Sequence, residues 1–144
     1  MNPKALTFNY FGTLVDVDRG GTLGMAEVLR RVSIETGDSA FDVYLDWDIR
    51  NVRLYRGQAY ARYRDVAQQA LAACLDARWP GVRKGHAIDA LTDAFLAHLV
   101  EASPPHADAV PFLDWAASRY PLMPITNMDS DLWRRTRLTR YSST

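Results

Sequence analysis

The chain has 144 residues, 48% of them hydrophobic, which suits one compact domain or one core with an insertion. Its 17 basic and 17 acidic residues give no net charge, so the composition favours neither nucleic acid nor an acidic membrane surface as a partner. One cysteine, Cys74, excludes an internal disulfide, and no apolar run approaches the roughly 18 residues of a membrane span. We therefore expect a cytoplasmic protein in which Cys74 is a small buried residue.

The first part of the chain is expected to begin with a strand and to continue as helices. Residues 4–10 form an apolar run rich in strand formers, and Gly12 then supplies a turn. From Thr22, a common N-cap residue, apolar residues recur at helical spacing as far as Ile34, and Gly37 is a stop signal. Further helices are expected over residues 41–57, 58–79 and 87–102.

Two prolines, at residues 104–105, mark the boundary between these helices and the rest of the chain. A helix follows with Pro111 in its first turn, where a missing amide donor does least harm. Residues 122–126 then form a short strand, in which Pro124 is tolerated only at an edge or near an end. The last helix is expected over residues 129–141.

This order of elements predicts an α/β fold with a parallel, Rossmann-like core and an all-helical insertion after the first strand. We assign residues 1–16 and 103–144 to the core and residues 17–102 to the insertion. Ligands of such folds bind at the carboxyl ends of the strands. Asn9 and Thr126 follow the two predicted strands, so a site is expected where those strand ends meet.

The residues at these strand ends resemble a known family. "FNYFGTLVD" resembles the first motif of the haloacid dehalogenase (HAD) superfamily, which is Asp, two variable residues, Gly, Thr and a hydrophobic residue. "PITNMDSDLW" resembles its second motif, a Thr or Ser at a strand end. The helical insertion is similar to the superfamily's cap of the first type, so the resemblance covers nearly the whole chain.

The resemblance implies a hydrolase with a covalent intermediate. A carboxylate at position 9 would attack an electrophilic carbon or phosphorus, and water would then cleave the resulting ester or acyl phosphate. Thr13 would position that nucleophile, while Thr126 and Asn127 would hold a polar group of a small-molecule substrate or the leaving atom.

Phe11 separates two branches of the superfamily. Its phosphatases generally have a second aspartate at this position, which serves as general acid and base and places its carbonyl on Mg²⁺. An aromatic residue there is similar to the 2-haloacid dehalogenases, which need no metal. The resemblance therefore implies a dehalogenase-like hydrolase of a small organic acid without a cofactor, with a Mg²⁺-dependent phosphatase as the alternative.

Asn9 departs from the family pattern, because an amide is a far poorer nucleophile than a carboxylate. We expect the chain as written to be inactive. Three explanations of Asn9 remain open. The residue could be an engineered substitution that traps a substrate complex, a change in a degenerate natural copy, or an amide that merely caps backbone groups at the strand end.

The chain ends before the lysine and acidic motifs that the resemblance implies. We expect a truncated fragment, a disrupted copy, or a core completed by a partner chain, with a homodimer left open. A non-catalytic remnant or binding module is therefore the alternative from outside the enzymes.

In the 2-haloacid dehalogenases that the chain resembles, an arginine directly after a tryptophan binds the substrate carboxylate. Here Asp48 follows Trp47, and Arg50 and Arg53 are the candidate substitutes, although a solvated helix face is the favoured interpretation of each arginine. Other aromatic residues of the insertion are expected to pack between helices, and some to touch substrate; they are Tyr55, Tyr60, Tyr63 and Trp79. The three histidines lack metal-ligand spacing, so no metal site is expected.

Overall fold

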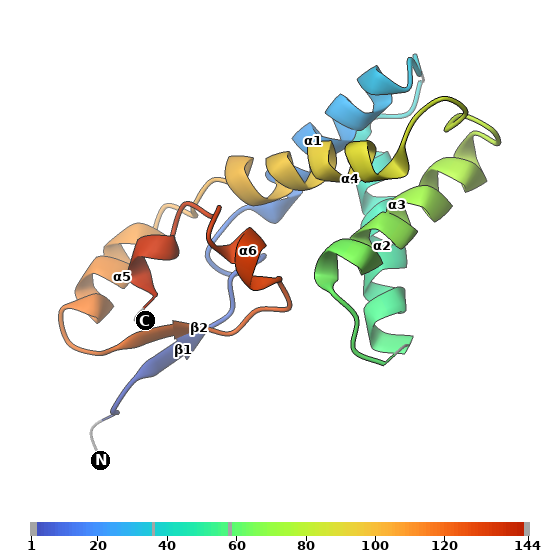
Figure 1. The fold of residues 1–144 in the computed structure, drawn as a ribbon. Coiled ribbons are helices and arrows are strands. Elements are labelled where there is room, and N and C mark those ends of the chain that lie inside the picture. Colours follow the sequence, from blue (N-terminus) through green and yellow to red (C-terminus); the bar gives the residue numbers. More distant parts are fainter. Residues whose placement is uncertain (1–2, 36, 58, 143–144) are drawn as a thin grey trace.

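The computed structural model describes residues 3–35, 37–57 and 59–142, and it confirms the α/β class. Figure 1 shows the strands and the shorter helices at one end of the molecule and the longer helices at the other. The helices are α1 (Val17–Arg31), α2 (Ala40–Gly57), α3 (Tyr63–Arg78), α4 (Ile88–Ala97), α5 (Ala109–Ala117) and α6 (Ser130–Trp133). The remaining elements are the strands β1 (Leu6–Phe8) and β2 (Leu122–Pro124), the π-helical turn η1 (His98–Ala102) and the 3₁₀ turn η2 (Thr139–Tyr141).

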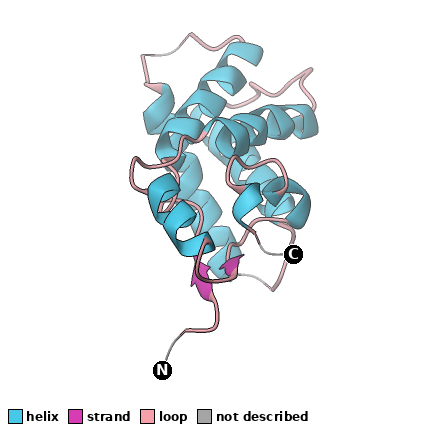
Figure 2. Cartoon of the chain, turned by 90° about the vertical axis from the view of Figure 1, so that its left-hand side faces the viewer, coloured by secondary structure: helices cyan, strands magenta, loops and turns pink. Residues whose placement is uncertain are grey.

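The two strands pair in parallel, with Leu6 opposite Leu122 and Phe8 opposite Pro124. Figure 2 shows them as the short magenta segments at one end of an otherwise helical molecule. Parallel pairing places both carboxyl ends at the same edge, as the sequence predicts. Both strands are shorter than the predicted ranges 4–10 and 122–126.

Pro124 fits the sheet because its nitrogen is not needed by the ladder. The backbone N–H of Ile125 donates to the Phe8 carbonyl at 2.8 Å. Because alternate residues of a strand point their amides to the same side, the nitrogen of Pro124 faces away from β1.

Helix α1 begins six residues earlier than the prediction. Asp16 supplies the N-cap, its Oδ1 accepting from the Arg19 N–H at 3.1 Å, while Thr22 is already inside the helix and donates to the Asp18 carbonyl. The helix also ends before Gly37, because Ser33 adopts a positive φ of 55°. The capping signal at Thr22 and the stop signal at Gly37 were therefore both assigned wrongly.

The last predicted helix, over residues 129–141, is mostly wrong. Only α6 is α-helical, and after it the backbone N–H groups of Arg135 and Thr136 bond three residues back, as in tight 3₁₀ turns. Thr139 Oγ1 donates to the Trp133 carbonyl at 2.8 Å, and Arg137 Nε donates to the Glu101 carbonyl at 2.7 Å. These side-chain bonds hold residues 134–138 as turns.

The other predicted helices are confirmed, with shifted bounds. Helix α3 begins at Tyr63 rather than near residue 58, which lies outside the described residues. The helix expected over residues 87–102 is α4 followed directly by η1.

The largest buried side chains of the helical end include Trp47 and Phe95, whose rings meet edge to face with centroids 4.4 Å apart. Cys74 is fully buried in this core, and burial raises the pKa of its thiol to about 12. The expectation of a small buried residue at this position is confirmed. In the described part of the chain, no helix combines the length and hydrophobicity that a membrane span requires.

Three glycines of α1 allow its close packing against α2, α4 and η1. Gly20, Gly21 and Gly24 are all buried, and a Cβ at each would collide with a neighbour, namely Ser103, the Tyr44 ring and the Phe95 carbonyl. The helix therefore tolerates residues of poor helix propensity because packing requires them.

Gly24→Ala should destabilise the chain, since the added Cβ would lie 2.7 Å from the backbone carbonyl oxygen of Phe95. We expect the free energy of unfolding to fall by about 1–3 kcal/mol, despite the better helix propensity of alanine. Denaturant unfolding measures the difference. Gly57→Ala is the matched control, because a Cβ there meets nothing within 4 Å, and an equal loss in both variants would contradict this account.

Candidate active site

A cavity of about 280 Å³ lies where the strand ends face the helical end of the molecule. Asn9 and Phe11 reach it from the segment after β1, and Thr126 and Asn127 from the segment after β2. Trp47 reaches it from α2. This volume is near the lower end of small-molecule sites, which run from about 300 to 1,000 Å³.

The turn after β1 fixes the side chain of Asn9. Gly12 has a φ of +69°, in the left-handed region that favours glycine, and the Leu14 N–H donates to the Tyr10 carbonyl at 2.9 Å. Asn9 Nδ2 donates to the Phe11 carbonyl at 2.9 Å and to Thr13 Oγ1 at 3.1 Å. Thr13 thus contacts position 9 directly.

The structure does not bring Arg50 and Arg53 to this cavity. Arg50 Nε pairs with Asp46 at 2.8 Å, one turn earlier on α2, and Arg53 is exposed. The carboxylate clamp expected of these two arginines is therefore absent from the cavity wall formed by the described residues.

Four further lining residues were missed from the sequence: Asp18, Tyr44, Asp48 and Asn51. The Tyr44 hydroxyl donates to Asp18 Oδ1 at 3.1 Å, joining α2 to α1. Tyr44, Asp48 and Asn51 lie on the same helix as Trp47, at spacings of three, one and four residues from it. That helical spacing from Trp47 was the available signal, because it places all four side chains on one side of α2.

Burial raises the pKa of Asp48, and the nearby charge of Asp18 raises it further. Burial likewise raises the pKa of Tyr44, with further increases from Asp48 and Asp18. The pKa of Tyr63 is raised by burial first and then by Asp48. Asp48 therefore lies in a partly desolvated position where the charge of Asp18 acts on it.

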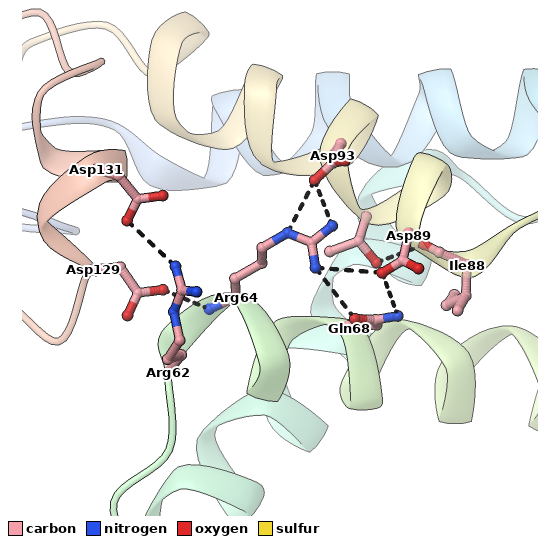
Figure 3. A network of polar contacts seen from close by, with 9 residues as sticks. Arg62, Arg64, Gln68, Ile88, Asp89, Asp93, Asp129 and Asp131 are labelled. Carbon is pink, nitrogen blue, oxygen red and sulfur yellow. Dashed lines mark hydrogen bonds and ion pairs between the residues drawn. The ribbon is translucent and has the colours of Figure 1, made fainter.

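The segment after β2 is fastened to the helical end through α3, as Figure 3 shows. Asp129 accepts from the backbone N–H of Tyr63 at 3.1 Å and from that of Arg64 at 3.0 Å. These N–H groups belong to the first turn of α3, whose own N-cap residue, Arg62, makes no side-chain cap. Asp129 thus caps a helix from the other end of the molecule.

The guanidinium of Arg64 extends the same network to α4. It pairs with Asp93 at 2.8 Å and with Asp89 at 3.4 Å, and Gln68 also bonds to Asp89 (Figure 3). Across the described residues, no group of three or more His, Cys, Asp or Glu side chains gathers as metal ligands would.

Solved structures of other proteins share this fold. The defluorinating L-2-haloacid dehalogenase Rha0230 has a TM-score of 0.77 and 20% identity, over 94% of this chain and 57% of that one. The L-2-haloacid dehalogenase of Xanthobacter autotrophicus has a TM-score of 0.67 and 19% identity, over 99% of this chain and 55% of its own. The HAD-hydrolase YfnB of Bacillus subtilis, solved with magnesium, has a TM-score of 0.76 and 17% identity, over 99% and 64%.

The chain therefore has the 2-haloacid dehalogenase-like fold that the two sequence motifs imply. It spans 57% of the Rha0230 chain and 55% of the Xanthobacter enzyme. No protein-family model matches the sequence, and no curated protein matches it either.

Replacing the Asp129 cap should weaken the connection between the two ends of the molecule. We expect Asp129→Ala to lower the free energy of unfolding by about 1 kcal/mol, the usual effect of losing a helix cap. Asp131→Ala is the control, because Asp131 makes an exposed pair with Arg62 at 3.7 Å, worth less than about 1 kcal/mol. Denaturant unfolding compares the two variants, and an equal loss in both would refute a special role for Asp129.

Asp48→Asn should raise the Tm at neutral pH. A raised pKa means that the folded chain holds this proton more tightly than the unfolded chain, so the carboxyl destabilises the fold as the pH rises through the folded value. Below about pH 3 the carboxyl is protonated in both states and the gain should vanish. Thermal unfolding across this range tests the sign, with Asp108→Asn at an exposed position as the control for the substitution itself.

Proposed function

We propose that this chain is the cap-bearing part of a HAD-type hydrolase that acts on a small organic molecule through an ester formed at position 9. The observation that carries the proposal is the single cavity lined by Asn9, Phe11, Trp47, Thr126 and Asn127. It is supported by the shared fold. In this proposal residues 17–102 are the cap over a core of residues 1–16 and 103–144.

The chemistry follows from the contacts of position 9. A carboxylate there would attack the carbon that bears the leaving group, the carbon–halogen bond would break with its electron pair going to the halide, and water would hydrolyse the ester. The Thr13 hydroxyl, now 3.1 Å from Asn9 Nδ2, could donate to such a carboxylate and orient it. Thr126 and Asn127 would hold the leaving atom or a polar group of the substrate.

With Asn9 in place, the chain is proposed to be inactive. The amide nitrogen donates to both Phe11 and Thr13, and an amide is too weakly nucleophilic to displace a halide at a useful rate. Arg50 and Arg53, the candidates for binding a substrate carboxylate, lie outside the cavity, so its lining gives no separate support for an acid as substrate.

A magnesium-dependent phosphatase is the second candidate, and YfnB, solved with magnesium, is the fold neighbour that favours it. The residues present do not fit that ion. Phe11 stands where the phosphatase pattern has an aspartate, and its carbonyl oxygen accepts a bond from Asn9 Nδ2 at 2.9 Å instead of facing the cavity unpaired. A binding module without catalysis is the remaining alternative, which Asn9 itself favours.

Asn9→Asp tests the proposal. We expect halide release from small haloalkyl compounds to rise more than roughly a hundredfold above the unchanged chain, as when a missing nucleophile is restored. Ion chromatography measures halide, and intact-mass spectrometry detects an ester retained at position 9. Asn9→Ala is the control and should show neither.

Phosphate release from generic esters is measured beside halide release, with and without Mg²⁺. Release of phosphate without release of halide would contradict the proposed dehalogenase function and support the phosphatase function. If neither product nor an adduct forms, the chain is a binding module and the hydrolase proposal is wrong.

A further inference from the structure

One side of α2 is apolar and uncovered. Its other sides pack against α1 and α3 or line the cavity, but Phe41, Leu45 and Ile49 remain 41%, 38% and 51% exposed. A spacing of four residues places these three side chains in one row along the helix. Large apolar side chains that are exposed singly need no explanation, whereas a contiguous row of them marks a surface that binds another protein.

Charged residues at the two ends of this apolar row have opposite signs. Asp42 is exposed in the first turn of α2, whereas Arg53 and Arg56 are exposed toward its end. None of the three forms an ion pair within the described part of the chain. At 3.6 residues per turn, Asp42 and Arg53 lie within roughly 40° of Ile49 around the helix axis, so the charges and the apolar row share one side of α2.

This order of charges is complementary to itself. Two copies of α2 that pack antiparallel about a twofold axis place the beginning of each helix beside the end of the other. With the axis midway between Asp42 and Arg53, each residue lies about 8 Å from it along the helix, so the two side chains meet across the pair. The helix dipole also favours an acid at the beginning and a base at the end, but it acts within one chain and requires no apolar row.

We propose that the apolar row of α2 binds a second copy of this chain. The two α2 helices pack antiparallel, Leu45 of each copy packs against Ile49 of the other, and an ion pair between Asp42 and Arg53 forms at each end of the contact. Burial of the apolar row supplies the main free energy of association. The two ion pairs fix the direction and register of the helices.

Different sides of α2 then serve the cavity and the dimer. Trp47 and Asp48 line the cavity, and the apolar row contacts the other copy. The dimer therefore stabilises one wall of each candidate active site, and the Tm of the chain should rise with protein concentration, as mass action requires. Association of this kind needs no catalysis, so it does not depend on the proposed hydrolase function.

Sedimentation equilibrium of charge-reversed variants tests the pairing. Asp42→Arg and Arg53→Asp each place like charges opposite each other at both ends of the contact, so each should weaken dimerisation by roughly tenfold or more. An equimolar mixture of the two variants should restore it, because every contact in the mixed dimer joins opposite charges. Arg134→Asp, at an exposed position after α6, is the matched control. It changes the net charge equally, but it should leave dimerisation unchanged by itself and should not restore it when mixed with Asp42→Arg.

Leu45→Glu tests the apolar row and should leave a folded monomer, with circular dichroism to check the fold. Its control is Phe112→Glu on α5, which is also exposed but lies at the opposite end of the molecule (Figure 1) and should not change the mass. If the unchanged chain is a monomer at its highest soluble concentration, the second copy is ruled out and the row is left to a different protein. A dimer that Leu45→Glu does not weaken, or that the mixture of charge variants does not restore, would equally overturn the proposal.

Discussion

The parallel pairing of β1 and β2 is the constraint on which the rest of the molecule depends. Leu6 and Leu122 lie opposite each other although the whole helical end is encoded between them. Because the strands are parallel, the polar residues that follow each of them lie at the same edge of the sheet. The chain between the strands must therefore leave this edge, form the helices and cross back to the opposite end of the sheet. The cavity is a product of this return, with one wall from the strand ends and the others from α1, α2 and α3.

Much of this architecture was predictable from the sequence. The errors of the prediction have physical causes. Hydrophobic spacing found the helices because burial on one face dictates it. It missed the beginning of α1, where Gly20 and Gly21 contradict helix propensity and only contact with Ser103 and Tyr44 explains them. It overextended the last helix, because the Arg137 side chain, which helps to divert the chain after Trp133, bonds to the carbonyl of Glu101, 36 residues away in sequence.

The cavity residues at the strand ends could be named from the sequence, whereas most of those on the helices could not. Residues such as Asn9 and Thr126 were found because strand ends are local features that carry their own turn signals. The polar residues of α2 that line the cavity were missed because side chains point in all directions around a helix. Only the packing of the neighbouring elements decides which side of the helix faces the cavity. Trp47 and its neighbour Asp48 both line the cavity, but the sequence drew attention to Asp48 only because it is not an arginine.

The cap that Asp129 gives to α3 has a consequence for how the chain folds. The acceptor and the backbone N–H groups are separated by 65 and 66 residues, so the first turn of α3 has no local partner to stabilise it. That turn can be completed only after the chain has closed a long loop, which is entropically costly. The helical end and the sheet end are therefore bound into one cooperative transition, and neither has its full stability before the other has formed.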